Sequence, residues 1–518
     1  MINNVKKTYL GIEFGSTRIK ACLTDDKYNP IASGGFSWEN CFEDGFWTYS
    51  LDLIHDGAKG CFKSLKEDVL KKYGSDFKKV DGIGISGMMH GYLAFDKDDN
   101  LLVPFRTWRN ATTSEAATEL TELFNFNIPQ RWSIAHLYQA ILNNEPHIKD
   151  VYRITTLAGY IHYRLTGEWA VGIGEASGIF PVDGMDYDKL MLDKFDKLMK
   201  EKGVDIDIYS VLPKVKTAGE KGAKLTEDGA AFLDESGTLK AGIPVCPPEG
   251  DAGTGMVATN SVRPKKGNVS AGTSVFSMLV LEKPLCKVYE EIDVVTTPDG
   301  SPVAMVHGNN GCSELAALVS MFGEFSRLIG VETDISKLYE ILYKNTQNAD
   351  ADCNGMVAYN YLAAEPVAGV AKGTPMYFHD LNTNMTLANF FKAQLYATVA
   401  VLKIGMNILV ENENVISDGF NAHGGLFKVE GVAQAILANA LKTPVTVSKT
   451  AGEGGAWGMA LLAAFMMEGE EMKLSDWLDE KVFSDMESKT INPDDAGVLG
   501  FEKYFENYIK GMGAQNLL

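Results

Sequence analysis

One glycine-rich stretch, residues 247–276, most constrains what this chain can fold into. Its first part, Gly250-Asp251-Ala252-Gly253-Thr254-Gly255, places an acidic side chain among glycines, which lose too much backbone entropy to favour a helix interior or a strand. We therefore expect a turn there, with a carboxylate and a backbone that a ligand can approach closely. Its second part predicts an apolar strand at 267–269, a small-residue turn at 270–274 and a strand at 275–281.

This pairing of a carboxylate with a small-residue turn has a chemical meaning. Small residues between two strands leave several N–H groups able to point at one anion. A base beside such an anion cradle is what the transfer of a phosphoryl group from a nucleotide to a hydroxyl needs. The alternative is a domain junction whose glycines serve only flexibility, and this stretch alone does not decide between the two.

Length, charge and cysteine spacing exclude several classes of protein. A chain of 518 residues is too long for one hydrophobic core and predicts two or more domains. The net charge of −20 argues against nucleic acid or an anionic membrane as partner, because binding either needs clustered Lys and Arg. The longest apolar run, 456–467, is too short to span a bilayer. We see no secretory pattern at the start and no CxxC pair among the seven cysteines. These two observations predict a cytoplasmic protein with reduced thiols.

Hydrophobic patterning predicts a mixed α/β fold in the first half of the chain. Strands over 8–12 and 19–23 form a β-hairpin with a polar tip, and a third strand at 31–37, a helix at 51–72 and a buried strand at 80–86 follow. A second hairpin is expected over 93–103, and the region 113–166 is helix-rich and ends at the natural cap Gly167.

The succession of strands and helices begins again after residue 266. The expected elements are strands at 267–281 and 303–307, helices within 312–347, a long helix at 387–411, a strand at 415–417, a helix at 429–441, a strand at 445–447 and a small-residue helix at 456–467. Two α/β domains that each open with strand hairpins predict a duplicated core around a cleft.

Seven motif regions in one order resemble the FGGY family of carbohydrate kinases, within the actin, hexokinase and Hsp70 ATPase superfamily. They are GIEFGSTRIKA at 11–21, ISGMMHG at 85–91, RLTGE at 164–168 with EASG at 175–178, GDAGTG at 250–255, SAGTS at 270–274, GGLFK at 424–428 and AGEGGAWGMALLAA at 451–464. The resemblance covers nearly the whole chain. It implies two RNase H-like domains around a central cleft, with residues 1–258 holding mainly the sugar and residues 259–518 mainly ATP.

The resemblance also implies where ATP and magnesium bind. The phosphates would contact Gly15, Ser16 and Thr17 with Lys20 nearby, and the second loop Gly272, Thr273 and Ser274, while Gly424, Gly425, Gly454 and Gly455 would pack against adenosine. Glu13 stands where the family has Asp; it would help to position Mg²⁺, with one more methylene of reach. The alternatives to nucleotide binding are an exposed hairpin tip at 15–17 and a purely structural helix cap at 454–455.

The same resemblance assigns the catalytic and sugar-binding residues. Asp251 matches the family's catalytic base, which must reach the substrate hydroxyl and accept its proton; a structural helix N-cap is the alternative. Met89 and His90 resemble the Met-His-Gly of xylulose kinases, although a lone His at a strand end is usually just a satisfied polar residue. Trp108 would pack on the C–H face of a sugar, and Asn110 carries an amide where the family has a carboxylate.

Two other motif matches are set aside. Residues 82–87 satisfy GxGxxG but lie inside a strand pattern with no helix after it, so a dinucleotide fold is not expected. Residues 96–100 have the acidity of a calcium loop without its length or terminal Glu, and we interpret them as a hairpin turn.

The sequence thus predicts a cytoplasmic ATP- and Mg²⁺-dependent kinase for a ketopentose such as D-xylulose, with ribulose, gluconate or another polyol as alternatives. A hypothesis from another class is a nucleotide-binding sugar sensor of the same fold, because Glu13, Ala252 and Asn110 depart from the family at the presumed reaction centre. Retention of Asp251 favours the enzyme, since a sensor needs no base. The oligomeric state stays open, a homodimer being one alternative.

Overall fold

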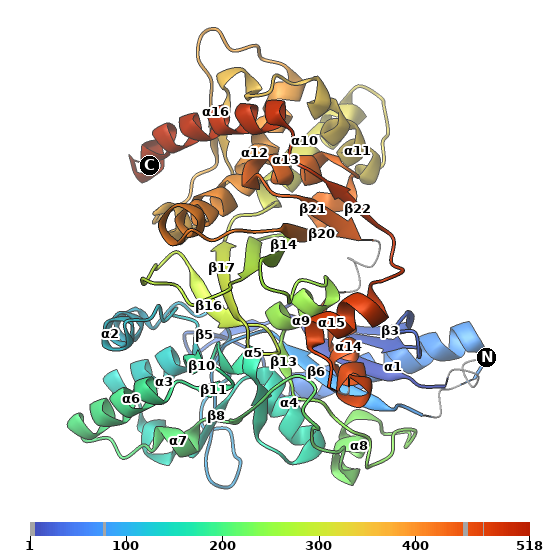
Figure 1. The fold of residues 1–518 in the computed structure, drawn as a ribbon, viewed down its shortest axis with the longest axis vertical. Helices are drawn as coiled ribbons and strands as arrows, with labels where there is room; N and C mark the ends of the chain where they lie inside the picture. The colour runs from blue at the N-terminus through green and yellow to red at the C-terminus, as the bar shows by residue number, and fades with distance from the viewer. Residues whose placement is uncertain (1–5, 76–78, 449–453, 470, 518) are drawn as a thin grey trace. The chain divides into compact units, whose positions relative to one another are not determined.

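The computed structural model describes residues 6–75, 79–448, 454–469 and 471–517 (Figure 1). The chain forms two compact units. The first comprises Met1–Val262, Val294–Val303 and Glu453–Asp485, and the second comprises Arg263–Asp293, Ala304–Gly452 and Met486–Leu518. The first segment of the first unit ends at Val262, whereas the sequence predicts one boundary at residue 258. Each unit is built from three separate segments of the chain.

The first unit contains thirteen complete strands and eleven α-helices among the residues described. The strands are β1 (Tyr9–Phe14), β2 (Arg18–Thr24), β3 (Pro30–Ser37), β4 (Cys41–Glu43), β5 (Phe46–Thr48), β6 (Gly82–Gly87), β7 (Leu93–Phe95), β8 (Arg153–Thr155), β9 (Ala170–Gly172), β10 (Val182–Asp183), β11 (Asp186–Tyr187), β12 (Lys214–Lys216) and β13 (Glu249–Gly250). The helices are α1 (Leu51–Tyr73), α2 (Ser114–Phe124), α3 (Ser133–Leu142), α4 (Leu157–Thr166), α5 (Ile173–Ala176), α6 (Lys189–Glu201), α7 (Ile208–Val211), α8 (Glu227–Leu233), α9 (Asp251–Ala258), α14 (Gly454–Glu468) and α15 (Leu474–Trp477).

The central sheet of this unit has the order β13-β6-β1-β2-β3. β1 pairs antiparallel with β2 and parallel with β6, and β6 pairs parallel with β13. Because side chains alternate along a strand, Leu10 and Ile12 pack into a core shared with α1, whereas Gly11 faces α14. The predicted order of strand, strand, strand, helix, strand is confirmed for the elements of this sheet and α1, but the short strands β4 and β5, which were not predicted, lie between β3 and α1. Figure 1 shows α1 and α14 beside this sheet.

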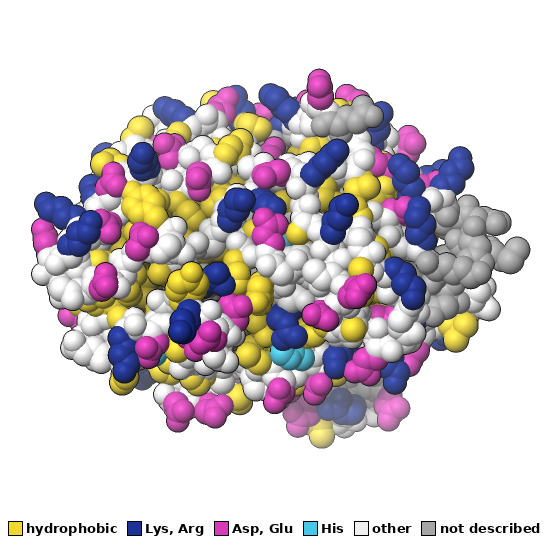
Figure 2. Space-filling model, turned by 90° about the horizontal axis from the view of Figure 1, so that it is seen from below, with side chains coloured by type: hydrophobic (Ala, Val, Ile, Leu, Met, Phe, Trp, Pro, Cys, Tyr) yellow, Lys and Arg dark blue, Asp and Glu magenta, His cyan; other side chains and the backbone are white. Residues whose placement is uncertain are grey.

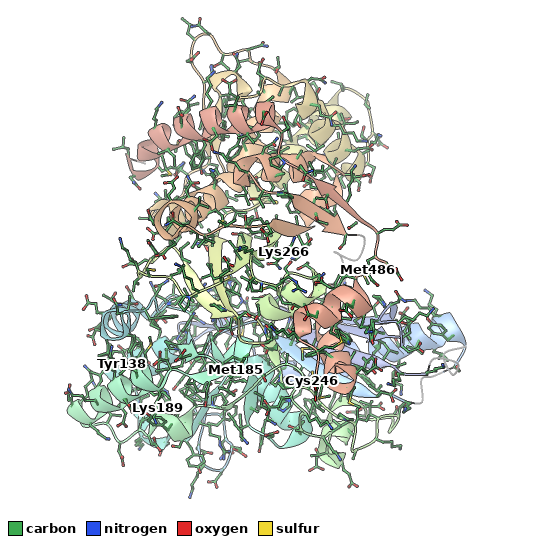
Figure 3. All side chains as sticks on the ribbon, in the orientation of Figure 1. Tyr138, Met185, Lys189, Cys246, Lys266 and Met486 are labelled. Carbon is green, nitrogen blue, oxygen red and sulfur yellow. The ribbon has the colours of Figure 1, made fainter. Side chains whose placement is uncertain are left out.

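Glycines let α14 lie directly against the sheet. A Cβ on Gly11 would sit 2.0 Å from the carbonyl oxygen of Ala456, and one on Gly84 would sit 2.8 Å from side-chain atoms of Met459, both residues of α14. The same Cβ on Gly84 would also sit 2.8 Å from Sγ of Cys246, which Figure 3 labels. The glycines of the GxGxxG match therefore serve close packing of a buried strand, as the interpretation of 82–87 requires.

The expectation of a turn at 250–255 is wrong, because Asp251 is the first residue of helix α9 and Gly250 is its cap. The glycine-rich sequence forms a helix here because α9 packs closely on α14. A Cβ on Gly458 would sit 2.0 Å from the carbonyl oxygen of Thr254, so larger residues at this contact would separate the two helices. Tertiary packing thus overrides the low intrinsic helix propensity of glycine.

The second unit contains the remaining elements. Its strands are β14 (Lys266–Ala271), β15 (Val275–Val280), β18 (Val357–Tyr359), β19 (Met376–Phe378), β20 (Gly419–Gly424), β21 (Val445–Ser448) and β22 (Ser488–Ile491), and β16 (Asp293–Thr296) and β17 (Pro302–Gly308) run across the unit boundary. Its helices are α10 (Ser313–Leu328), α11 (Ile335–Asn345), α12 (Leu387–Asn407), α13 (Val432–Leu441) and α16 (Asp495–Gly511).

The second sheet repeats the arrangement of the first. Its order is β16-β17-β15-β14-β20-β21-β22, with β14 antiparallel to β15 and parallel to β20, and β20 parallel to β21. The predicted strand at 415–417 is wrong: the strand is β20, whose six residues pair with β14 from Lys266–Gly419 to Ala271–Gly424. Pairing with a partner about 150 residues earlier, rather than local apolar character, decides where this strand begins.

Helix α12, which continues into a π-helical turn at Ile408–Asn412, is the central helix of the second unit. Among the residues described, this segment is the one helix long and apolar enough to cross a membrane, and 78% of its most apolar window is buried inside the structure.

Several smaller predictions can be compared with the structure. Gly167 caps α4 with a φ of 75°, and Asp96 accepts the amides of Asp98 and Asn100 in a turn, as expected. The partner strand at 101–103 is wrong, since only Leu101 bridges to Phe95. Figure 2 shows one face of the molecule, on whose described part acidic and basic side chains are intermixed, so the net negative charge is not concentrated there.

We predict that Gly11→Ala destabilises the first unit. The new methyl group would meet the Ala456 carbonyl and the Ala460 amide within 2.5 Å, so α14 must shift away from β1. Urea unfolding should show a loss of about 1–3 kcal/mol, the usual effect of overpacking. Gly513→Ala, where no atom lies within 4 Å of the added Cβ, is the matched control. An unchanged midpoint for Gly11→Ala would contradict this account of the packing.

Candidate active site

The candidate site of the first unit lies at the carboxyl ends of three neighbouring parallel strands. β13 ends at Gly250, β6 at Gly87 and β1 at Phe14. The residues that follow these ends are Asp251, the segment 88–91 and the hairpin tip 15–17. In open α/β sheets, ligands bind just beyond the carboxyl ends of the strands. Segments far apart in the sequence are therefore brought together where a site is expected.

Asp251 is held in place by backbone amides. Its Oδ1 accepts the amide of Met89 at 3.1 Å, so the carboxyl group is tied to the end of β6. Burial raises the pKa of Asp251 to about 7, and the negative charge of Glu13 raises it further, against the opposing hydrogen bonds from Met89 and Ala252. A carboxyl group that titrates near neutral pH can accept a proton from a hydroxyl group and release it again.

His90 adopts a backbone conformation that few residues other than glycine take, with a φ of 69°. Its Nδ1 lies 3.1 Å from the carbonyl oxygen of Gly178, and its ring stacks on Trp132 with centroids 6.1 Å apart. A Cβ on Gly178 would sit 2.6 Å from that nitrogen, which explains the small residue there. Left-handed backbone in a non-glycine residue is held by its surroundings and is frequent at functional sites.

The hairpin tip at Gly15, Ser16 and Thr17 is braced from one side. The carbonyl of Gly15 accepts the indole Nε1–H of Trp38, that of Ser16 accepts the hydroxyl of Tyr49, and that of Thr17 accepts the backbone amide of Trp38. Each trans peptide directs its N–H opposite to its C=O. The amides of Ser16, Thr17 and Arg18 therefore point away from this brace, which is the arrangement of an anion cradle.

Glu13 lies on the N-terminus of α14. Its carboxylate accepts the amides of Gly455 and Ala456, and its Oε2 is 4.0 Å from Nζ of Lys20. Burial raises the pKa of Glu13, while Lys20 and the two amides lower it. A Cβ on Gly455 would sit 2.5 Å from Oε1 of Glu13, and one on Gly454 would be 3.7 Å from Nζ of Lys20. The structure thus brings these four predicted residues together, while residues 451–453 of the same motif lie outside the described residues.

Trp108 and Asn110 lie in the segment between β7 and α2 of the first unit. Trp108 donates from its indole nitrogen to Oγ of Ser16 at 3.0 Å, which links a predicted sugar contact to the hairpin tip. Asn110 is buried, with its oxygen accepting the amide of Trp47 and its nitrogen donating to the carbonyls of Trp47 and Thr107. The amide of Asn110 is therefore engaged by the protein in this conformation, and its contact with a sugar stays a prediction.

The second unit has a hairpin tip of the same design, formed by Gly272, Thr273 and Ser274 between β14 and β15. The carbonyls of Gly272 and Thr273 accept the amides of Cys312 and Gly311 at 2.7 and 2.8 Å. Gly424 ends the neighbouring strand β20 with a φ of 103°, which a residue with a side chain rarely adopts, and Gly425 follows it. Five predicted nucleotide contacts thus lie at or just beyond adjacent strand ends in this unit.

Two buried glutamates near the base were missed in the sequence. Glu249 lies two residues before Asp251 and accepts the amide of Glu175 at 2.9 Å, and Gly172 and Gly174 leave room for its carboxyl group. Burial raises the pKa of Glu249 to about 8. Burial also raises that of Glu175 well above its usual value, and the charges of Glu249 and Asp251 add to this. The EASG motif contains Glu175, but nothing local shows that it folds back towards Asp251.

The carboxylates fit a magnesium ion that arrives with a nucleotide. Mg²⁺ typically takes one or two protein carboxylates and completes its shell with water and phosphate oxygens. Glu13 and Asp251 are near enough for the charge of Glu13 to raise the pKa of Asp251, and a cation would relieve that repulsion. Within the described ranges, no group of three or more His, Cys, Asp and Glu side chains could hold a metal by itself.

Asp251→Asn should remove a pH-dependent cost to stability. Because the pKa of Asp251 is raised in the folded state, folding favours its protonated form, and stability falls as the pH rises through about 7. The asparagine keeps an acceptor for the Met89 amide but carries no charge. We expect a melting temperature above that of the parent at pH 8.5 and a difference that shrinks at pH 5.5. Asp98→Asn, on an exposed turn, is the control, and parallel pH profiles for Asp251→Asn and the parent would contradict the assignment.

Comparison with known proteins places these features in a family. The N-terminal domain model of the FGGY family of carbohydrate kinases matches residues 8–258, and its C-terminal domain model matches residues 267–467. A xylulose kinase from Haemophilus influenzae is 21% identical, with 97% of this chain and 98% of that protein covered.

Solved structures show the same fold. A ligand-bound xylulose kinase from Lactobacillus acidophilus superimposes with a TM-score of 0.79 at 17% identity, covering 98% of each chain. A gluconate kinase from Lactobacillus acidophilus gives a TM-score of 0.78 at 17% identity, again over 98% of each chain. Kinases for different sugars therefore share this two-domain architecture to a similar degree.

Proposed function

Because the chain belongs to the FGGY family of carbohydrate kinases, we propose that it phosphorylates D-xylulose or a related ketopentose with ATP. The observation that carries this proposal is the placement of Asp251. Its carboxyl group follows a parallel strand, is fixed by the Met89 amide and has a pKa of about 7. The choice of a ketopentose rests on Met89-His90-Gly91 and on the xylulose kinases that the chain is similar to.

In the proposed reaction Asp251 acts as the general base. Its carboxylate accepts the proton of a sugar hydroxyl as the oxygen forms a bond to the γ-phosphorus. The bond between that phosphorus and the bridging oxygen breaks, and ADP leaves with the electron pair. A base whose pKa lies near the working pH combines a large ionised fraction with enough basicity to take the proton.

The sugar would be held by the residues around this base. His90 is fixed by Gly178 and Trp132, so it can present a rigid polar edge to hydroxyl groups. The indole of Trp108 offers an apolar face for the C–H groups of a sugar, and Asn110 completes the proposed set. Rigid hydrogen-bonding groups reject analogues that lack the matching hydroxyl.

The two hairpin tips are the proposed phosphate sites. Ser16, Thr17 and Arg18 in the first unit present amides away from a carbonyl brace, with Lys20 nearby. Gly272, Thr273 and Ser274 would do the same in the second unit, and Gly424, Gly425, Gly454 and Gly455 would pack against adenosine. Magnesium, when bound, would neutralise charge on the phosphates, and Glu13 would orient it through water.

Two alternatives remain. A kinase for gluconate, ribulose or a glycerol-like polyol would use the same base, because the fold is shared by kinases for several sugars. A nucleotide-binding sugar sensor would use the same binding residues without phosphoryl transfer. The raised pKa of Asp251 favours an enzyme, since a sensor gains nothing from an unstable buried carboxylate beside Glu13.

We predict ADP release that depends on one sugar. The assay couples ADP release to a colour change with ATP, Mg²⁺ and a panel of ketoses, aldoses, polyols and sugar acids. One pentulose should give saturable turnover, and Asp251→Ala should reduce kcat by roughly 10²–10⁴-fold while ATP still binds. Turnover with a sugar of another class would show that the proposed substrate is wrong. ATP binding without turnover across the whole panel would favour the sensor.

The pH dependence of kcat/KM should report the base. Because Asp251 must be ionised to accept a proton, activity should fall about tenfold for each pH unit below about 7 and level off above it. Initial rates between pH 5.5 and 8.5, at fixed ionic strength and low sugar concentration, measure this profile. Asp98→Asn should leave the profile unchanged. A flat profile in the parent protein would show that Asp251 does not act as the base.

A further inference from the structure

The hairpin tip of the second unit takes its shape from a segment that begins about 40 residues later. The amide of Gly311 donates to the carbonyl of Thr273, and the amide of Cys312 donates to that of Gly272. Within the tip, the amide of Gly272 donates to the carbonyl of Ser274 at 2.9 Å. A Cβ on Gly311 would sit 2.5 Å from the Gly272 carbonyl, so this contact needs a glycine.

These bonds decide which way the amides of the tip point. In a trans peptide the C=O of one residue and the N–H of the next lie on opposite sides. With the carbonyls of Gly272 and Thr273 bound to the segment 310–312, the amides of Thr273 and Ser274 are directed away from it. Thr273 is exposed, so these amides can reach a ligand in solution.

The segment 310–312 is itself fixed by buried polar side chains. Nδ2 of Asn360 donates to the carbonyls of Asn310 and Gly311 at 2.9 and 2.8 Å. Oδ1 of Asn310 accepts the amides of Leu362 and Ala363. Both asparagines are at least 95% buried, so a broken bond would leave a polar group without water.

Glu365 completes this clamp. Its side chain is fully buried, and its Oε2 accepts both the backbone amide and Nδ2 of Asn310, at 3.1 and 2.9 Å. Burial raises the pKa of Glu365 to about 7, against the hydrogen bonds from Asn310. A single acceptor oxygen makes both bonds, so the clamp does not require the charge of the carboxylate.

We propose that Asn310 and Glu365 are positioning residues for nucleotide binding, which hold the segment 310–312 so that the amides of Thr273 and Ser274 face the phosphate chain of a nucleoside triphosphate. This inference rests on the proposed function, because it takes the tip as a phosphate site. Neither side chain needs to touch the nucleotide. They act through Gly311, Cys312 and the carbonyls of the tip.

The test compares Asn310→Ala and Glu365→Ala with two matched variants. Glu365→Gln keeps an acceptor in the place of Oε2, and Asn309→Ala removes a neighbouring exposed asparagine whose side chain donates only to the carbonyl of Ala364. Calorimetry measures the Kd for MgATP and for inorganic tripolyphosphate, and steady-state kinetics gives KM for ATP and for the sugar.

We expect the Kd for MgATP and for tripolyphosphate to rise roughly tenfold or more in the two alanine variants. This is the effect of losing one or two buried hydrogen bonds. The KM for the sugar should change less than twofold, and Glu365→Gln and Asn309→Ala should resemble the parent. Melting curves confirm that each variant is folded. If Asn310→Ala does not fold, Asn360→Ala carries the same test.

Three results would count against the inference, and they are distinguishable. Folded alanine variants that bind MgATP and tripolyphosphate as the parent does would show that the clamp does not position the tip, and the proposed kinase would stand. A parent protein that binds neither compound would remove the phosphate site itself and the proposed function with it. An equal rise in the KM for ATP and for the sugar would indicate general loosening and also count against it.

Discussion

The direct contact of α14 with the central strands of the first unit is the interaction on which the candidate site depends. Because Gly11 has no side chain, the Ala456 carbonyl can lie where a Cβ would otherwise be. At this distance the first amides of α14 reach the Glu13 carboxylate. A segment more than 430 residues later in the chain thus neutralises part of a buried charge beside Asp251.

The two hairpin tips use one physical device with different supporting groups. In each, carbonyl oxygens are bound from one side, and planar peptides then turn the following amides to the other side. In the first unit the support is aromatic, with Trp38 and Tyr49 stacked 4.3 Å apart. In the second unit it is a buried polar clamp, which is more directional but leaves costly unpaired groups when broken. The repeated strand order of the two sheets makes this parallel possible.

Much of the fold was predictable because it follows from neighbouring residues. The β1–β2 hairpin, helix α1, the Gly167 cap and the turn at Asp96 each depend on local periodicity or on one residue's backbone preference. The predictions failed where a distant partner decides. α9 forms although its sequence is rich in glycine, because it packs on α14, and β20 begins at Gly419 because its register with β14 requires it.

The sequence by itself determined the family of the chain, the order of its elements and the positions of Asp251 and the two glycine-bearing tips, since motifs and local propensities are properties of short segments. Only the tertiary structure decided which groups surround them. The bond between Glu175 and Glu249, Trp38 behind Gly15, and Glu365 behind the second tip are contacts between residues far apart in the chain. Packing creates such contacts, and the burial that accompanies packing raises the pKa of Asp251 to about 7.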